Sequence, residues 1–390
     1  MRDDFLPFTA PFIGDEEVRE IVETLTSGWL TTGPKTQRFE DEFREYVGAP
    51  GALSLNSCTA GLHSALIAHQ IGPGDEVITT PMTFAASVNV IEHVGARPVL
   101  VDVEPDTLNI CPQQTEDAVT PQTKAIIPVH LAGHPAELDS IHDIARRRNL
   151  IVIEDAAHAV AARYKGRAIG SGDNPVAFSF YATKNLTTGE GGMLTGDPDF
   201  LGRARVISLH GMSREAWSRY VGDGSWLYDI VTPGFKYNMT DLQASLGIWQ
   251  LKRLDDVQRR RREIVQLYQQ AFASVEQLEL PVERPEVEHA WHLYSVRLRR
   301  NTTSTNRDAL ARELYQRGIG TSVHFIPVHL HSWYRNRYGW RAHDFPVAFD
   351  SFCRILSLPL GPRMSDDDAG RVIESVLDIV APGQRIRLAA

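Results

Sequence analysis

The sequence predicts an α/β fold, in which a large domain with a mostly parallel, doubly wound sheet precedes a smaller C-terminal α+β domain. Short apolar strands alternate with helices between residues 52 and 148. Two further apolar runs, 150–153 and 176–180, each lead to charged side chains. The alternation stops after residue 209. Strands that alternate with helices pair in parallel through right-handed crossovers, and the ligands of such sheets lie at the carboxyl ends of the strands.

The large domain is expected to begin with an extended arm and two helices. Apolar residues at helical spacing predict a helix at 15–26 that Gly28 ends, and a second helix at 36–47 that Gly48 ends. A strand at 52–55 then leads into an apolar helix that reaches about residue 69. The next strand and helix pairs are 76–79 with 83–94, 98–103 with 112–119, and 124–129 with 136–148, and a strand at 192–195 with a helix at 198–209 closes the domain.

The C-terminal region has a different pattern. Residues 213–235 form a long irregular stretch rich in aromatic residues, and a loop of this length in a compact protein is usually functional. Residues 241–275 are expected to be mostly helical, with the arginine run 259–262 on a solvated face. A strand at 291–298 and helices at 307–316 and 366–379 complete the prediction. Without a Gly/Ser linker, the domains are expected at 1–250, arm included, and 251–390, joined through the long helix.

Composition excludes several classes of protein. The chain has 390 residues, with 40 basic and 49 acidic side chains and a net charge of −9, which argues against non-specific nucleic-acid binding. No apolar run has the length of a signal peptide core or a membrane span, so we expect a cytoplasmic protein without a membrane partner. Cys58, Cys111 and Cys353 are scattered and suggest neither a disulfide framework nor a metal site.

One lysine lies where a buried strand is expected to end. Residues 176–180 lead to Lys184, and Thr187, Thr188 and several glycines follow. This position suits a nucleophilic amine, because burial lowers the pKa of a lysine and supplies the neutral form that condenses with an aldehyde. A solvated lysine in a turn is the alternative, since lysines are mostly exposed.

A carboxylate and a small-residue turn accompany this lysine. Asp155 follows the apolar run 150–153 and would stand at the same edge of the sheet, although a capping or salt-bridging role would give the same pattern. Together, an amine and an acid match what pyridoxal phosphate needs, namely a lysine for its aldehyde and a carboxylate for its pyridine nitrogen. The turn at 56–61 opens a helix whose free N–H groups could seat a phosphate, or it is an ordinary strand-to-helix turn.

The spacing of these motifs resembles that of the DegT family of nucleotide-sugar aminotransferases, especially the members that form UDP-4-amino-4-deoxy-L-arabinose and other 4-amino sugars. The family implies a fold type I pyridoxal-phosphate transferase, similar to aspartate aminotransferase. The resemblance covers nearly the whole chain and rests on the motifs GWLTTGP at 28–34, TAGLH at 59–63, EDAAHA at 154–159, SFYATKN at 179–185, GEGG at 189–192, PGFKYN at 233–238, HAWHL at 289–293 and GIGT at 318–321.

The resemblance implies roles for individual residues. Lys184 would carry the cofactor and the catalysis. Cofactor contacts would come from Thr59, Ala60, Phe84, Asp155, His158, Ser179 and, across a dimer interface, Asn238. The amides of Thr59 and Ala60 and the Ser179 hydroxyl would hold the phosphate, and Phe84 would stack on the pyridine ring. Without the family, Phe84 and His158 could equally be core residues. Substrate contacts are expected from Thr31, Tyr220, His324 and Tyr334, with Arg219 or Arg335 at a diphosphate.

The implied activity is transamination of a nucleotide-diphosphate keto-sugar, most often a 4-keto-6-deoxy sugar, with glutamate as donor and 2-oxoglutarate as product, in amino-sugar biosynthesis for an antibiotic or a surface glycan. The implied assembly is a homodimer with shared active sites. A 3-keto-sugar or a keto-inositol as acceptor stays open. Sugar dehydratases of the same fold have a histidine in place of Lys184, and a non-catalytic regulator would not need Asp155, Lys184 and a phosphate turn together.

Overall fold

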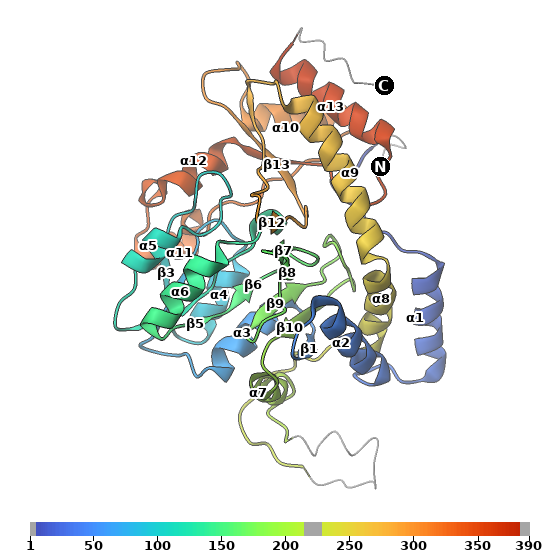
Figure 1. Cartoon of the computed structure of the whole chain (residues 1–390), viewed down its shortest axis with the longest axis vertical. Coiled ribbons are helices and arrows are strands. Elements are labelled where there is room, and N and C mark those ends of the chain that lie inside the picture. The colour runs from blue at the N-terminus through green and yellow to red at the C-terminus, as the bar shows by residue number, and fades with distance from the viewer. Residues whose placement is uncertain (1–4, 214–227, 383–390) are drawn as a thin grey trace.

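The centre of the large domain is a sheet made of two four-stranded parts (Figure 1). The computed structural model describes residues 5–213 and 228–382. In spatial order the first part contains β3 (Arg97–Leu100), β2 (Glu76–Thr79), β4 (Thr123–Ile126) and β5 (Ile151–Val152). The second contains β6 (Glu154–Asp155), β9 (Val176–Ser179), β10 (Gly192–Thr195) and β1 (Ala52–Leu55). The two parts meet where the chain passes from β5 into β6.

The sheet is mostly parallel, which confirms the predicted fold class. β2 pairs in parallel with β3 and β4, β4 with β5, and β6 with β9. Only β10 runs antiparallel to its neighbours β9 and β1. The connection between β9 and β10, residues 180–191, contains no crossover helix. A parallel pairing needs a crossover, usually a helix, that carries the chain back to the start of the neighbouring strand, and without such a helix β10 turns back along β9.

Helices cover both faces of the sheet, because successive strand residues point to opposite sides. Ala177 packs toward one face, in a core shared with α3 (Cys58–Ala68), α4 (Ala86–His93) and α7 (Pro198–Ser208). Phe178 packs toward the other, with α2 (Pro34–Val47) and α8 (Asp241–Lys252). Further along that face lies α6 (Leu138–Arg148). Two other helices of this domain are α1 (Asp15–Ser27), which lies beside α8 in Figure 1, and the short α5 (Pro112–Asp117).

The smaller domain is an antiparallel sheet with helices on it. The strands β11 (Leu278–Glu279), β13 (Tyr294–Leu298) and β14 (Ile355–Leu358) share a core with α9 (Leu254–Phe272), α10 (Arg307–Gln316) and α13 (Asp366–Val380). The region 241–275, which was predicted as one helix, consists of two helices, α8 and α9, which meet at Arg253. In Figure 1, α9 rises from α8 into the small domain.

Part of the C-terminal region packs on the large domain. Residues 328–348 lie against α4 and β3, where Val328 and Phe345 share a core with Met82. Asp102 accepts hydrogen bonds from the N–H groups of Val347 and Ala348 at the start of α12 (Pro346–Arg354), at 2.8 and 3.0 Å. The domain boundary at residue 250 stays a prediction, and residues 328–348, which follow it in the sequence, pack on the domain that precedes it.

The remaining short elements are 3₁₀ turns at Leu131–Gly133, Val328–Leu330 and Ala342–Asp344, helix α11 (Ser332–Tyr338), and a small sheet of β7 (Arg163–Tyr164), β8 (Arg167–Ala168) and β12 (Val287–Glu288).

Two further sequence expectations concern the aromatic loop and the membrane. The ends of the loop are bridged, since Met212 pairs with Ile230 and Leu209 with Lys236 in antiparallel geometry. Tyr220 and Arg219 lie outside the described residues. Throughout the described part of the chain, no helix combines the length and the apolar character that crossing a bilayer requires.

The prediction that the arginine run is solvated is wrong for Arg261. Its side chain is only 1 % exposed, and its Nη1 donates to the main-chain oxygens of Trp291, His292 and Leu360 at 3.2–3.3 Å. Burial lowers the pKa of this guanidinium to about 10, so it stays charged at neutral pH. The run covers more than one turn of helix, and its third member therefore faces the junction between the domains while Arg259 faces solvent.

Replacement of Arg261 by methionine should destabilise the protein, because it leaves buried carbonyl groups without a donor, a loss of about 1–3 kcal/mol. The matched control is Arg259→Met, which removes only an exposed ion pair with Asp256 at 2.6 Å and should change the free energy of unfolding by less than about 0.5 kcal/mol. Urea unfolding followed by circular dichroism measures both. Equal effects would contradict the anchoring role of Arg261.

Candidate active site

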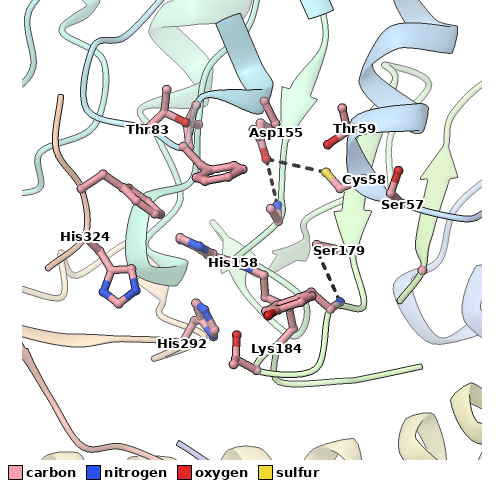
Figure 2. A pocket seen from close by; sticks show the side chains of 18 of the residues that line it. Ser57, Cys58, Thr59, Thr83, Asp155, His158, Ser179, Lys184, His292 and His324 are labelled. Atoms are coloured by element: carbon pink, nitrogen blue, oxygen red, sulfur yellow. Dashed lines mark hydrogen bonds between the residues drawn. The ribbon is translucent and has the colours of Figure 1, made fainter. Parts of the chain in front are cut away.

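The parallel pairing of β6 with β9 brings Asp155 and Lys184 to one edge of the sheet. Asp155 pairs with Ala177, so the two strands end at the same edge of the sheet. The loop after β9 folds back on itself, because Phe180 N–H donates to Gly191 O and Thr188 N–H to Phe180 O, each at 2.9 Å. Lys184 lies in this loop. The two side chains line a cavity of about 510 Å³, as the sequence predicted from the strand ends (Figure 2).

The environment of Lys184 favours its neutral form. Burial lowers its pKa to about 8, against the opposing effect of Cys58 and Asp155, which favour the charged form. An ammonium group in this cavity loses hydration that the few nearby acceptors do not replace. Close to one amine in ten is therefore neutral at pH 7, compared with fewer than about one in a thousand for an exposed lysine. The lysine is prepared to act as a nucleophile.

Asp155 is held in a fixed orientation by hydrogen bonds to both of its oxygens. Ser87 Oγ–H donates to Oδ2 at 2.7 Å, and the Ala157 N–H donates to Oδ1 at 3.1 Å. The Cys58 thiol lies 3.9 Å from Oδ1, and burial followed by repulsion from Asp155 raises the pKa of this thiol, so it stays protonated and can donate. The carboxylate is 5 % exposed, and its charge can serve a partner inside the cavity.

The neighbouring carboxylate, Glu154, is engaged on the other side of the strand. It lies 3.0 Å from Nε2 of His130 and 3.5 Å from Nε2 of His142. Burial alone would raise the pKa of Glu154, but these two histidines lower it to about 2. Because adjacent strand residues point to opposite faces, only one member of the pair can reach the cavity, and the structure shows that it is Asp155.

The turn before α3 lines the cavity with small polar side chains. Ser57 caps the helix, and its Oγ accepts the Ala60 N–H at 3.1 Å. Thr59 and Ser179 line the cavity, whereas Ala60 does not, and the contact of its amide with a phosphate stays a prediction. Strand β10 passes against the turn so closely that a Cβ at Gly192 would lie 2.5 Å from the Ser57 carbonyl carbon. A side chain there would displace the turn.

Aromatic and imidazole rings form another wall of the cavity. Phe84 is 65 % exposed, and its ring lies 6.1 Å from that of Phe325. The ring of His158 stacks on Phe325 at 5.7 Å and an interplanar angle of 16°, and it lies 4.4 Å from His292. Burial, and then the charge of Lys184, lower the pKa of both histidines. A large exposed phenylalanine beside neutral rings fits a planar ligand that would cover it.

Other predicted substrate residues lie in different places. His324 lines the cavity, its Nδ1 lies 2.9 Å from Ser357 Oγ, and burial lowers its pKa to about 4. Thr31 is exposed and does not line the cavity. The expectation for Tyr334 is corrected, because its ring is buried in the core between α4 and α11 and its hydroxyl donates to Asn89. Arg335 on α11 does not line the cavity either.

Asn238 lies outside the cavity of its own chain. Its Nδ2 donates to Thr32 Oγ1 at 2.7 Å, and its Oδ1 is buried without a hydrogen-bond partner among the described residues. The residue follows Tyr237 and pairs with Leu55 at the edge of the sheet.

Several site residues were missed by the sequence analysis. Their contacts come from segments far apart in the chain, so spacing gave no signal for most of them. Ser57 could have been found as a serine directly before a helix, and His292 belongs to a motif already noted. The missed residues are Phe8, Ser57, Cys58, Thr83, Ser87, Tyr181 and His292. Within residues 5–213 and 228–382 no group of three or more His, Cys, Asp or Glu side chains is placed to hold a metal ion.

The residues present fit pyridoxal phosphate. The cavity offers an amine of lowered pKa in Lys184, a hydrogen-bonded carboxylate in Asp155 and an exposed aromatic face in Phe84. On the side of Ser57, Thr59 and Ser179, hydroxyl groups gather at the N-terminus of α3, where the helix dipole favours an anion (Figure 2). This set supplies partners for the aldehyde, the ring nitrogen and the phosphate of the cofactor.

Comparisons with known proteins agree with this chemistry. Residues 11–377 match the model of the DegT/DnrJ/EryC1/StrS aminotransferase family. The spore coat polysaccharide biosynthesis protein SpsC of Bacillus subtilis is 53 % identical over 381 residues, which are 97 % of this chain and 98 % of SpsC.

Two proteins of known structure are also similar. The putative sugar aminotransferase Spr1654 of Streptococcus pneumoniae is 37 % identical, and its PLP form superposes with a TM-score of 0.89 over 95 % of this chain and 97 % of that one. Its PMP form superposes with a TM-score of 0.90. PseC of Helicobacter pylori, an aminotransferase involved in the biosynthesis of pseudoaminic acid, is 25 % identical with a TM-score of 0.88, over 96 % of this chain and 99 % of that one. The chain therefore belongs to the DegT/DnrJ/EryC1/StrS aminotransferase family, and its cofactor is pyridoxal phosphate.

Proposed function

We propose that this aminotransferase moves an amino group from glutamate to the 4-keto group of a nucleotide-diphosphate-linked sugar, in the biosynthesis of an amino sugar for a surface glycan or an antibiotic. The observation that carries the proposal is the pairing of Lys184 with the fixed Asp155 in one cavity. SpsC, Spr1654 and PseC are named for polysaccharide or sugar chemistry, which supports a sugar as acceptor.

The chain's own residues would divide the work as follows. Pyridoxal phosphate supplies a reactive aldehyde and an electron-withdrawing ring. Lys184 Nζ holds the cofactor in the resting enzyme and later moves a proton to and from the substrate carbon. Asp155 stabilises a positive charge on the ring nitrogen. Ser57, Thr59 and Ser179 bind the phosphate and so fix its position, and Phe84 covers one face of the ring.

The residues that line the cavity also support the proposal that a sugar is the acceptor. None of the described lining residues is an arginine, whereas aminotransferases for amino acids commonly hold the substrate carboxylate with a bidentate guanidinium. The lining instead combines aromatic rings with scattered hydroxyl and imidazole groups, among them Tyr181, His324 and Phe325. Such surfaces suit the alternating C–H and O–H groups of a sugar.

Replacement of Lys184 by alanine should abolish covalent cofactor binding. The visible absorbance of the lysine-linked cofactor should disappear, and borohydride should no longer fix the cofactor to the chain. In the parent apoenzyme, the rate of cofactor attachment should rise with pH around a midpoint near 8, because only the neutral amine reacts and burial has lowered its pKa. Lys124→Ala, on an exposed strand position, is the control and should behave as the parent. Cofactor found on a different lysine after reduction of Lys184→Ala would refute the assignment.

A homodimer with shared active sites is part of the proposal, supported by the buried Oδ1 of Asn238, which has no hydrogen-bond partner within residues 5–213 and 228–382. Lys184→Ala and Asn238→Asp should each be inactive as pure proteins. Hybrid dimers, obtained by co-expressing the two variants with different tags, should recover activity at one of their two active sites. That site receives an intact Lys184 from one chain and an intact Asn238 from the other. The matched control combines Lys184→Ala with Asp155→Asn, two residues of the same cavity, and should recover nothing. Lack of recovery in purified Lys184/Asn238 hybrids would argue against sharing.

The acceptor is tested with a panel of nucleotide-linked 4-keto-sugars, nucleotide-linked 3-keto-sugars, keto-inositols and the corresponding free keto-sugars, with glutamate as donor and mass spectrometry as readout. Removal of the nucleotide should lower kcat/KM by on the order of a hundredfold or more, since binding energy from the remote group orients the reacting carbon. Equal turnover of the free sugar, or efficient amination of oxaloacetate with no sugar nucleotide accepted, would contradict the proposed substrate.

A further inference from the structure

The N-terminal residues 5–13 form a strap that joins the two domains across the active site. At its beginning, Leu6 N–H donates to Gly318 O and Gly320 N–H donates to Leu6 O, both at 2.8 Å. At its end, Gln250 Nε2 of α8 donates to Phe12 O at 2.7 Å, and the Arg253 guanidinium lies 4.9 Å from the centre of the Phe12 ring. The strap is thus fastened to the small domain at one end and to the large domain at the other.

Between these anchors, the strap places Phe8 in the wall of the cavity. The Phe8 ring centre lies 5.4 Å from that of His324, with an interplanar angle of 31°. In Figure 2, His324 lies on the opposite side of the pocket from Ser57, Thr59 and Ser179, where the cofactor phosphate is expected. Phe8 therefore lies on the side of the cavity away from the expected phosphate site, where the substrate would bind.

Main-chain contacts of Phe8 attach this part of the strap to the small domain. The Phe8 carbonyl accepts the Leu360 N–H at 3.3 Å. Its amide nitrogen lies so near residue 320 that a Cβ on Gly320 would come within 2.8 Å of it. Truncation of the ring should consequently leave the strap attached, which separates the role of the side chain from that of the segment.

We propose that Phe8 is a specificity-determining residue whose ring packs against the C–H face of the acceptor's sugar ring. The inference rests on the proposed function and adds the residue that recognises the acceptor. An aromatic face covers the C–H groups of a pyranose or furanose while the hydroxyl groups turn to polar partners. A flexible amino-acid donor has no comparable flat face, so its half-reaction should depend little on Phe8.

The test compares the two half-reactions in the holoenzyme variants Phe8→Ala and Phe8→Leu. Stopped-flow absorbance follows conversion of the cofactor by the amino donor, and then its reconversion by the best ring ketone that the parent enzyme accepts. Phe8→Ala should lower the second-order rate constant for the ring ketone by on the order of tenfold, with a change of less than about twofold for the donor and for 2-oxoglutarate. Phe8→Leu should lie between Phe8→Ala and the parent.

The matched control is Phe5→Ala on the same strap. Phe5 packs on Tyr315 of α10 at 5.7 Å and does not line the cavity, so both half-reactions should stay at the parent rates. Unchanged lysine-linked absorbance and melting temperature in Phe8→Ala would show that the cavity and the strap are intact. Equal losses in both half-reactions, or no loss for the ring ketone, would overturn the role of Phe8. Use by the parent of a ring ketone without a nucleotide would instead overturn the proposed substrate, and the Phe8 variants would be judged with that ketone.

Discussion

The catalytic arrangement depends on the parallel pairing of β6 with β9. Parallel neighbours end at the same edge of a sheet, so Asp155 and the loop that carries Lys184 meet although 28 residues separate them in the chain. The antiparallel return through β10 then keeps the lysine loop short, and it brings Gly192 against the turn that precedes α3. The main-chain pairing of the strands therefore positions the amine of Lys184, the carboxylate of Asp155 and the N-terminus of α3.

Burial gives these groups their chemical character. Lys184 has few acceptors near it, so loss of hydration favours the neutral amine, whereas Asp155 accepts hydrogen bonds on both oxygens and is held in one orientation. Histidines 158, 292 and 324 are kept neutral by the same loss of hydration, and they present planar uncharged rings to the cavity. The site thus combines a reactive amine, a carboxylate fixed by hydrogen bonds and walls that contain aromatic and imidazole rings, a combination that suits a charged, planar cofactor.

The two domains are connected at several points around this cavity. Asp102 accepts hydrogen bonds from the start of α12, and Val328 and Phe345 share a core with Met82. The strap of residues 5–13 spans from the small domain to α8. Substrate must therefore bind between parts of the chain whose relative position is strongly constrained. A preorganised cavity of this kind lowers the entropy lost when a substrate becomes ordered in it.

The sequence by itself determined the α/β class, the parallel pairing of most strands, most helices to within a few residues, and the pair Lys184 and Asp155, because these depend on local periodicity and on where apolar runs end. It did not determine that Arg261 is buried or that Tyr334 lies in the core, since the solvent exposure and the partners of a side chain depend on segments that are distant in the chain. For the same reason, the sequence did not place Ser87 and Phe8 in the site. Only the tertiary structure decides which distant segments meet, because packing and hydrogen bonding, and not sequence spacing, select those contacts.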